Sequence, residues 1–77
     1  MDQELFNLEL RKFLKRFGIT AQREMEKAVE GAIQRKALSG HEVLKVRATL
    51  AIPEVLPELV IDGEIALDGP PPPPPAA

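Results

Sequence analysis

The stretch from Ala21 to Leu38 constrains the fold of this chain more than any other. Its apolar residues recur at helical spacing and fall on one stripe: Ala21, Met25, Ala28, Val29, Ala32, Ile33 and Leu38. Such a stripe can meet a second helix on one flank and strands on the other, so we expect this helix to lie at the centre of the core. The helix is predicted to end near Leu38, where Ser39 and Gly40 follow.

A first helix is predicted over residues 2–17, DQELFNLELRKFLKRF. Its large apolar side chains share one face: Phe6, Leu10, Phe13, Leu14 and Phe17. The predicted corner between the helices is the segment 17–20, FGIT. Gly18 suits the left-handed position that ends a helix, and Thr20 can cap the next one. A connection this short makes the two helices neighbours.

From His41 onward the apolar period changes from helical spacing to two. The apolar members of the first predicted strand are Leu44, Val46, Ala48, Leu50 and Ile52, and they alternate with Val43, Lys45, Arg47, Thr49 and Ala51. This alternation predicts a half-buried strand. Pro53 and Pro57 are expected to bracket a loop, because proline lacks the N–H donor that a strand interior needs. A second strand is predicted from about Glu58 to Leu67.

The Asp62-Gly63 pair allows two interpretations of that second strand. Asp-Gly between apolar runs is a strong signal for a two-residue hairpin turn. A continuous strand instead places Gly63 on the inner face, where a helix could approach, and keeps four apolar side chains together: Leu59, Ile61, Ile65 and Leu67. Side-chain phase favours the continuous strand, and the turn remains the alternative.

Length and composition predict one small domain with a tail. The chain has 77 residues, of which 44% are hydrophobic and 29% are charged, which is typical of a soluble globular domain. We expect a compact domain over residues 1–68 and a disordered polyproline tail over residues 69–77. The start lacks the basic and apolar segments of a signal peptide, and no apolar run approaches the roughly 20 residues needed to cross a bilayer. The predicted location is therefore cytoplasmic, without membrane contact.

No constellation of residues suggests catalysis, so the chain is predicted not to be an enzyme. Cysteine is absent, which excludes disulfides and thiolate chemistry. His41 is the only histidine and Ser39 the only serine, and we interpret both as loop residues rather than as a base and a nucleophile. The carboxylates Asp62, Glu64 and Asp68 lack the spacing of a calcium loop. We therefore assign no catalytic, cofactor-binding or metal-binding residue.

Two features of the predicted helices bear on binding. The basic residues Arg11, Lys12, Lys15 and Arg16 fall on the outer side of the first helix. A solvated face explains them most simply, and an anionic partner is the functional alternative. The segment FGITAQREMEKAVEGAIQ is superficially similar to a helix-turn-helix, but Glu24, Glu26 and Glu30 would lie near phosphates, and a third helix is missing.

Three segments together resemble a family of small uncharacterised bacterial proteins, a domain of unknown function. They are FNLELRKFLKRFGITAQREME, the strand that follows it, and IDGEIAL, and the resemblance spans residues 1 to about 68. It implies a bacterial cytoplasmic protein and a compact standalone domain. It implies no catalytic or binding residue.

The expected fold is α+β, in the order helix–helix–strand–strand, with both helices on one face of an antiparallel hairpin. The expected function is a non-enzymatic protein-interaction module, and nucleic-acid binding through the helix pair is the alternative. We expect a monomer rather than a homodimer. Pairing of like strand edges about a two-fold axis would bring Lys45 and Arg47, or Asp62 and Glu64, close to their own copies.

Overall fold

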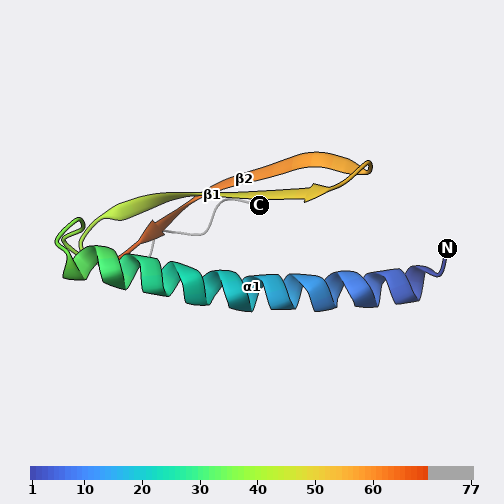
Figure 1. Cartoon of the computed structure of the whole chain (residues 1–77), viewed down its shortest axis with the longest axis horizontal. Coiled ribbons are helices and arrows are strands. Elements are labelled where there is room, and N and C mark those ends of the chain that lie inside the picture. Colours follow the sequence, from blue (N-terminus) through green and yellow to red (C-terminus); the bar gives the residue numbers. More distant parts are fainter. Residues whose placement is uncertain (70–77) are drawn as a thin grey trace. The chain divides into compact units, whose positions relative to one another are not determined.

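The computed structural model describes residues 1–69, which form one helix followed by one β-hairpin (Figure 1). The helix is α1 (Gln3–Gln34), and the strands are β1 (Val43–Ile52) and β2 (Leu56–Ala66). The chain divides into a helical unit of residues 1–37 and a hairpin unit that begins at residue 38. This confirms the α+β class. The predicted order helix–helix–strand–strand is wrong, because a single helix replaces the predicted pair.

α1 continues without interruption through the predicted corner at residues 17–20 (Figure 1). No proline lies between Gln3 and Gln34. Phe17 and Ala21, on either side of Gly18, lie on the same face of the helix, so the apolar periodicity continues through the glycine. A glycine inside a helix costs only about 1 kcal/mol relative to alanine. Breaking the helix there would forfeit several backbone hydrogen bonds, each worth about 0.5–1.5 kcal/mol net. The helix therefore tolerates Gly18 instead of ending at it.

Both ends of α1 are capped by local hydrogen bonds. At the N-terminus, Asp2 Oδ1 accepts a hydrogen bond from the Leu5 N–H at 3.0 Å. At the C-terminus, the Lys36 N–H donates to the Ile33 carbonyl at 3.0 Å, and the Ala37 N–H donates to the Ala32 carbonyl at 2.8 Å. These two hydrogen bonds form a Schellman motif, which requires a left-handed residue, and Lys36 takes that conformation with φ 63°. The predicted end near Leu38 was thus about one turn too late.

The hairpin has an apolar and a polar face, as its alternation predicts. On the apolar face, Leu44 is paired with Ile65 and Leu50 with Leu59. On the polar face, the directly opposed pairs are Lys45 with Glu64 and Arg47 with Asp62. β2 runs through Asp62 and Gly63 without a turn, which confirms the continuous strand. A Cβ atom built on Gly63 would meet nothing within 4 Å in the described hairpin, and the close approach of a helix at Gly63 stays a prediction.

The connection between the strands is shorter than predicted. β2 begins at Leu56 and includes Pro57, which was expected in the loop. The register shifts between Leu50 and Ile52, and this irregularity is the kind of position at which a strand tolerates proline. The turn is closed by a hydrogen bond of 3.0 Å from the Val55 N–H to the Ile52 carbonyl, with Glu54 at φ 68°.

The large apolar side chains of α1 are not buried as a core helix would require. Ala32, at 8% exposed, is the buried hydrophobic residue of the described chain. Phe6, Phe13 and Phe17 remain 43–48% exposed. Within residues 1–69, no helix is both long and apolar enough to cross a membrane. The predicted tail, apart from Gly69, lies outside the described residues.

Candidate interaction surface

One apolar face of α1 is the most extensive surface feature of the helical unit. Glu24 lies at the same angular position as Phe6, and at about 100° per residue eight apolar side chains between Phe6 and Ala28 fall within the same third of the helix circumference. We call them the apolar stripe: Phe6, Leu10, Phe13, Leu14, Phe17, Ala21, Met25 and Ala28. The predicted corner at residues 17–20 divides this stripe between two helices, and both parts were expected in a core. The signal for a single surface was the unchanged phase on either side of Gly18.

Two of the phenylalanines form an ordered patch within the stripe. The rings of Phe13 and Phe17 lie with their centroids 6.4 Å apart and their planes at 24°. The guanidinium carbon of Arg16 lies 5.8 Å from the Phe13 centroid, which is a cation–π distance. The patch therefore has a large apolar surface and a positive charge at its edge.

The predicted basic surface lies mostly on the side of α1 away from the stripe. Lys12, Lys15 and Arg16 line a shallow hollow of about 390 Å³ with Ile19, Thr20 and Arg23, whereas Arg11 does not line it. Lys12 also forms an ion pair of 3.6 Å with Glu9, and both side chains are more than half exposed. Nothing in the hollow selects one anion over another, so a binding role for these four residues stays a prediction.

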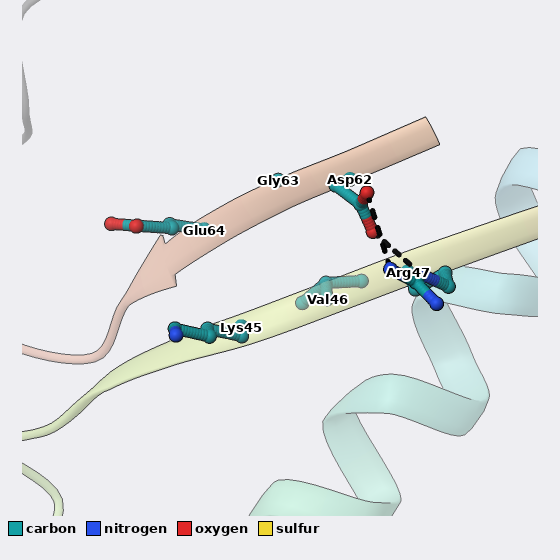
Figure 2. Close-up of a pocket in the computed structure, with 6 residues that line it drawn as sticks. All are labelled: Lys45, Val46, Arg47, Asp62, Gly63 and Glu64. Carbon is teal, nitrogen blue, oxygen red and sulfur yellow. Dashed lines mark hydrogen bonds and ion pairs between the residues drawn. The ribbon is translucent and has the colours of Figure 1, made fainter. Parts of the chain in front are cut away.

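The polar face of the hairpin carries an ion pair between its strands. Arg47 Nε donates to Asp62 Oδ1 at 2.7 Å, and Nη2 donates to Oδ2 at 3.4 Å (Figure 2). Both side chains are about two-thirds exposed, so the pair contributes little to stability. A hollow of about 670 Å³ lies between Lys45, Val46, Arg47, Asp62, Gly63 and Glu64 (Figure 2). Two cations and two carboxylates line it, and this balance of charge gives no preference for an ionic ligand.

A hydrogen-bonded turn precedes the hairpin. The Glu42 carboxylate accepts from the backbone N–H groups of Ser39, Gly40 and His41 at 2.8, 2.9 and 3.1 Å. These donors, with that of Ser39 foremost, lower the pKa of Glu42 to about 2. The carboxylate therefore stays charged at all physiological pH values and holds the turn.

His41 and Asp68 form an exposed pair at the open end of the hairpin. His41 Nδ1 lies 2.5 Å from Asp68 Oδ2, and this hydrogen bond lowers the pKa of Asp68. Ser39 Oγ accepts a hydrogen bond from the His41 backbone N–H at 3.3 Å. A nucleophilic serine would instead donate its hydroxyl proton to the imidazole ring. The three side chains thus shape the turn, and residues 1–69 hold no group of histidines and carboxylates suited to a metal ion.

The comparisons with known proteins identify a family but not an activity. The model of a family of unknown function (DUF6494) matches residues 1–68. The search of curated proteins and the search of solved structures found no match.

Proposed function

The chain belongs to this family of unknown function, and we propose that it is a non-enzymatic module that binds another protein through the apolar stripe of α1. The single observation that supports this most is the exposure of the phenylalanines Phe6, Phe13 and Phe17. Buried apolar surface contributes about 25 cal/mol per Å², and aromatic side chains dominate the energetics of protein interfaces. A helix that presents such rings in a row is suited to docking against an apolar partner surface.

The polar groups of the chain support binding rather than catalysis. The hydrogen bonds of Ser39 and Glu42 lie within one turn, and the imidazole ring of His41 pairs with the exposed carboxylate of Asp68. The strongest ion pair of the hairpin, between Arg47 and Asp62, is exposed and balanced. We therefore propose no reaction for this chain.

The alternative function, nucleic-acid binding through a helix pair, was suggested by a similarity to a helix-turn-helix motif. A helix-turn-helix needs a turn at residues 17–20, and these residues lie inside α1. The similarity of FGITAQREMEKAVEGAIQ to that motif is therefore misleading, because its central residues are helical.

Photo-crosslinking from two leucines tests the proposed function. Leu14 lies on the stripe and Leu8 lies off it, and their exposures are nearly equal at 53% and 54%. A photoreactive phenylalanine analogue at Leu14 is expected to crosslink to a second polypeptide of discrete mass in living cells. The same analogue at Leu8 is the control and is expected not to do so. Equal yields at both positions, or no crosslink at Leu14, would overturn the proposed function.

A further inference from the structure

We propose that the protein bound by the apolar stripe is a second copy of this chain, paired antiparallel, with the two-fold axis passing at the level of Ile19. The inference rests on the proposed function, because it names the partner of the same surface. It is based on the order of side chains along α1. Stripe residues lie at nearly equal distances on either side of Ile19, with large side chains before it and smaller or more flexible ones after it.

The facing side chains complement each other in volume. When two copies of α1 run antiparallel about residue 19, each position faces the one equally far on the other side. Large side chains then face smaller or more flexible ones at three levels, namely Leu10 with Ala28, Phe13 with Met25, and Phe17 with Ala21. The two-fold axis produces each pair twice, so six levels of the interface are filled.

A parallel pair in register would pack the same stripe poorly. Phe13 and Phe17 would each meet their own copy, while Ala21 and Ala28 would each face their own copy across a gap. Overpacking and cavities both cost stability. The size gradient along α1 therefore favours the antiparallel direction.

The spacing of the stripe keeps two straight helices in contact. Phe6, Phe17 and Ala28 are 11 residues apart, as are Leu10 and Ala21. An 11-residue repeat corresponds to about 3.67 residues per turn, close to the 3.6 of a straight helix. The contact can thus extend along the length of the stripe with little supercoiling.

Charges along one edge of the stripe complement each other in the same register. Glu9 and Lys27 share one angular position beside the stripe, whereas Glu24 lies within the stripe at the angle of Phe6. Reversing the second helix brings Glu9 within two residues of the level of Lys27, an attraction that the two-fold axis produces twice, and it places Glu24 at the level of Leu14. The Glu9–Lys12 ion pair within the chain is exposed and weak, and it does not prevent this arrangement.

The exposed apolar area of two copies reaches the lower bound for a specific dimer. The six large side chains of the stripe are 37–53% exposed, and they are Phe6, Leu10, Phe13, Leu14, Phe17 and Met25. Side chains of this size expose roughly 60–120 Å² each at these fractions. Twelve of them in a dimer offer about 1,000 Å², which is the lower bound for an interface that persists in solution.

The monomer was predicted from the strand edges of the hairpin and not from the apolar stripe. That prediction was made for a fold in which two helices bury their apolar faces in a core. The single helix α1 leaves its stripe exposed instead, which offers a route to pairing that does not involve the strand edges.

Disulfide trapping in the full chain tests the register directly, because the chain has no cysteine of its own. A Leu10→Cys chain mixed with an Ala28→Cys chain is expected to form a disulfide between copies. Leu10→Cys alone is expected not to, since residues 10 of two antiparallel copies are separated by about 27 Å along the axis. Cα atoms must come within about 7 Å for a disulfide. The matched control is a mixture of Lys12→Cys and Glu26→Cys chains, which share the axial level but lie away from the stripe.

Each result of the trapping decides one point. A disulfide of Leu10→Cys with itself, or a Leu10/Ala28 yield no greater than that of the control, would overturn the antiparallel pair. If the Leu14 analogue then still crosslinks to another polypeptide, the proposed function stands with a different partner. If it does not, both proposals fail.

A charge reversal provides a second test that leaves the apolar stripe intact. Glu9→Lys is expected to raise the dimer Kd roughly 2–30-fold, because both copies lose an attraction to Lys27 and gain a repulsion. The double variant Glu9→Lys with Lys27→Glu is expected to restore the Kd in sedimentation equilibrium. Failure of the double variant to recover would overturn the proposed register.

Discussion

At the scale of single residues, Lys36 shows how the helix ends without a glycine. Its left-handed backbone, at φ 63°, positions the N–H groups of Lys36 and Ala37 on the last carbonyls of α1. A residue with a Cβ atom pays about 1–2 kcal/mol for this conformation, whereas glycine adopts it freely. The motif therefore forms at a local cost that one substitution can remove.

Lys36→Gly is expected to stabilise the helix by about 0.5–1 kcal/mol, because it relieves this backbone strain while keeping both capping hydrogen bonds. The measurement is the midpoint of urea unfolding followed by circular dichroism. Lys36→Ala keeps the strain and should give no gain. A loss of stability in the glycine variant would mean that the lysine side chain contributes more than its backbone costs.

Glu42 makes the turn before the hairpin sensitive to acid. The pKa of its carboxyl is lowered from 4.5 to about 2 by hydrogen bonds from the backbone, chiefly from Ser39. A lowered pKa means that the stabilisation is complete above pH 4.5 and is lost as the pH falls toward 2. The amide NMR shifts of Ser39 and Gly40 are expected to titrate together with a midpoint near 2. Glu42→Gln should abolish that titration, and a midpoint near the ordinary value would contradict the turn geometry.

At the scale of elements, the hairpin was predictable and the continuity of the helix was not. Strand side chains have a period of two, so the alternation from Leu44 to Ile52 determines which residues share a face. Gly18 carries an ambiguous signal, because glycine both ends helices and is tolerated inside them. The end of α1 was missed because Lys36 carries no sequence signal for a left-handed conformation.

The same ambiguity explains why the candidate site was missed. Dividing α1 at Gly18 assigned Phe13 and Phe17 to one core helix and Met25 to another. The basic cluster could be found locally, since four cations lie within residues 11–16. The apolar stripe becomes visible only when the phase is followed across the whole helix. A surface built from half-exposed phenylalanines has the same pattern as a core, and only the structure distinguishes the two.

Gly18→Ala distinguishes the continuous helix from the predicted corner. A Cβ atom at this position meets nothing within 4 Å in the described chain, so alanine fits without rearrangement. The free energy of unfolding is expected to rise by up to about 1 kcal/mol, because alanine has the higher helix propensity. Far-UV circular dichroism during urea unfolding provides the measurement. Had Gly18 adopted a left-handed corner, the same change would lower stability.

At the scale of the whole molecule, the proposed pairing links helix stability to concentration. A helix in a protein gains most of its stability when its apolar face packs against another surface, and less from helix propensity. If the stripe of α1 is covered by a second copy, mass action makes the stability of the helix depend on protein concentration. The hairpin differs from the helix, since a two-stranded sheet is only marginally stable by itself, and within residues 1–69 each of its strands has one unpaired edge.

Dilution is therefore expected to change mass and helix content together. Light scattering should report twice the chain mass of 8.5 kDa at high concentration and approach the single mass on dilution, with the signal at 222 nm falling in parallel. Leu14→Asp should remove this dependence, because a charge on the stripe blocks pairing, whereas Leu8→Asp should keep it. A mass of 8.5 kDa at every concentration would favour the monomer. Doubling of the mass that survives Leu14→Asp would place the contact on another surface, and the strand edges of the hairpin would then be the first to examine.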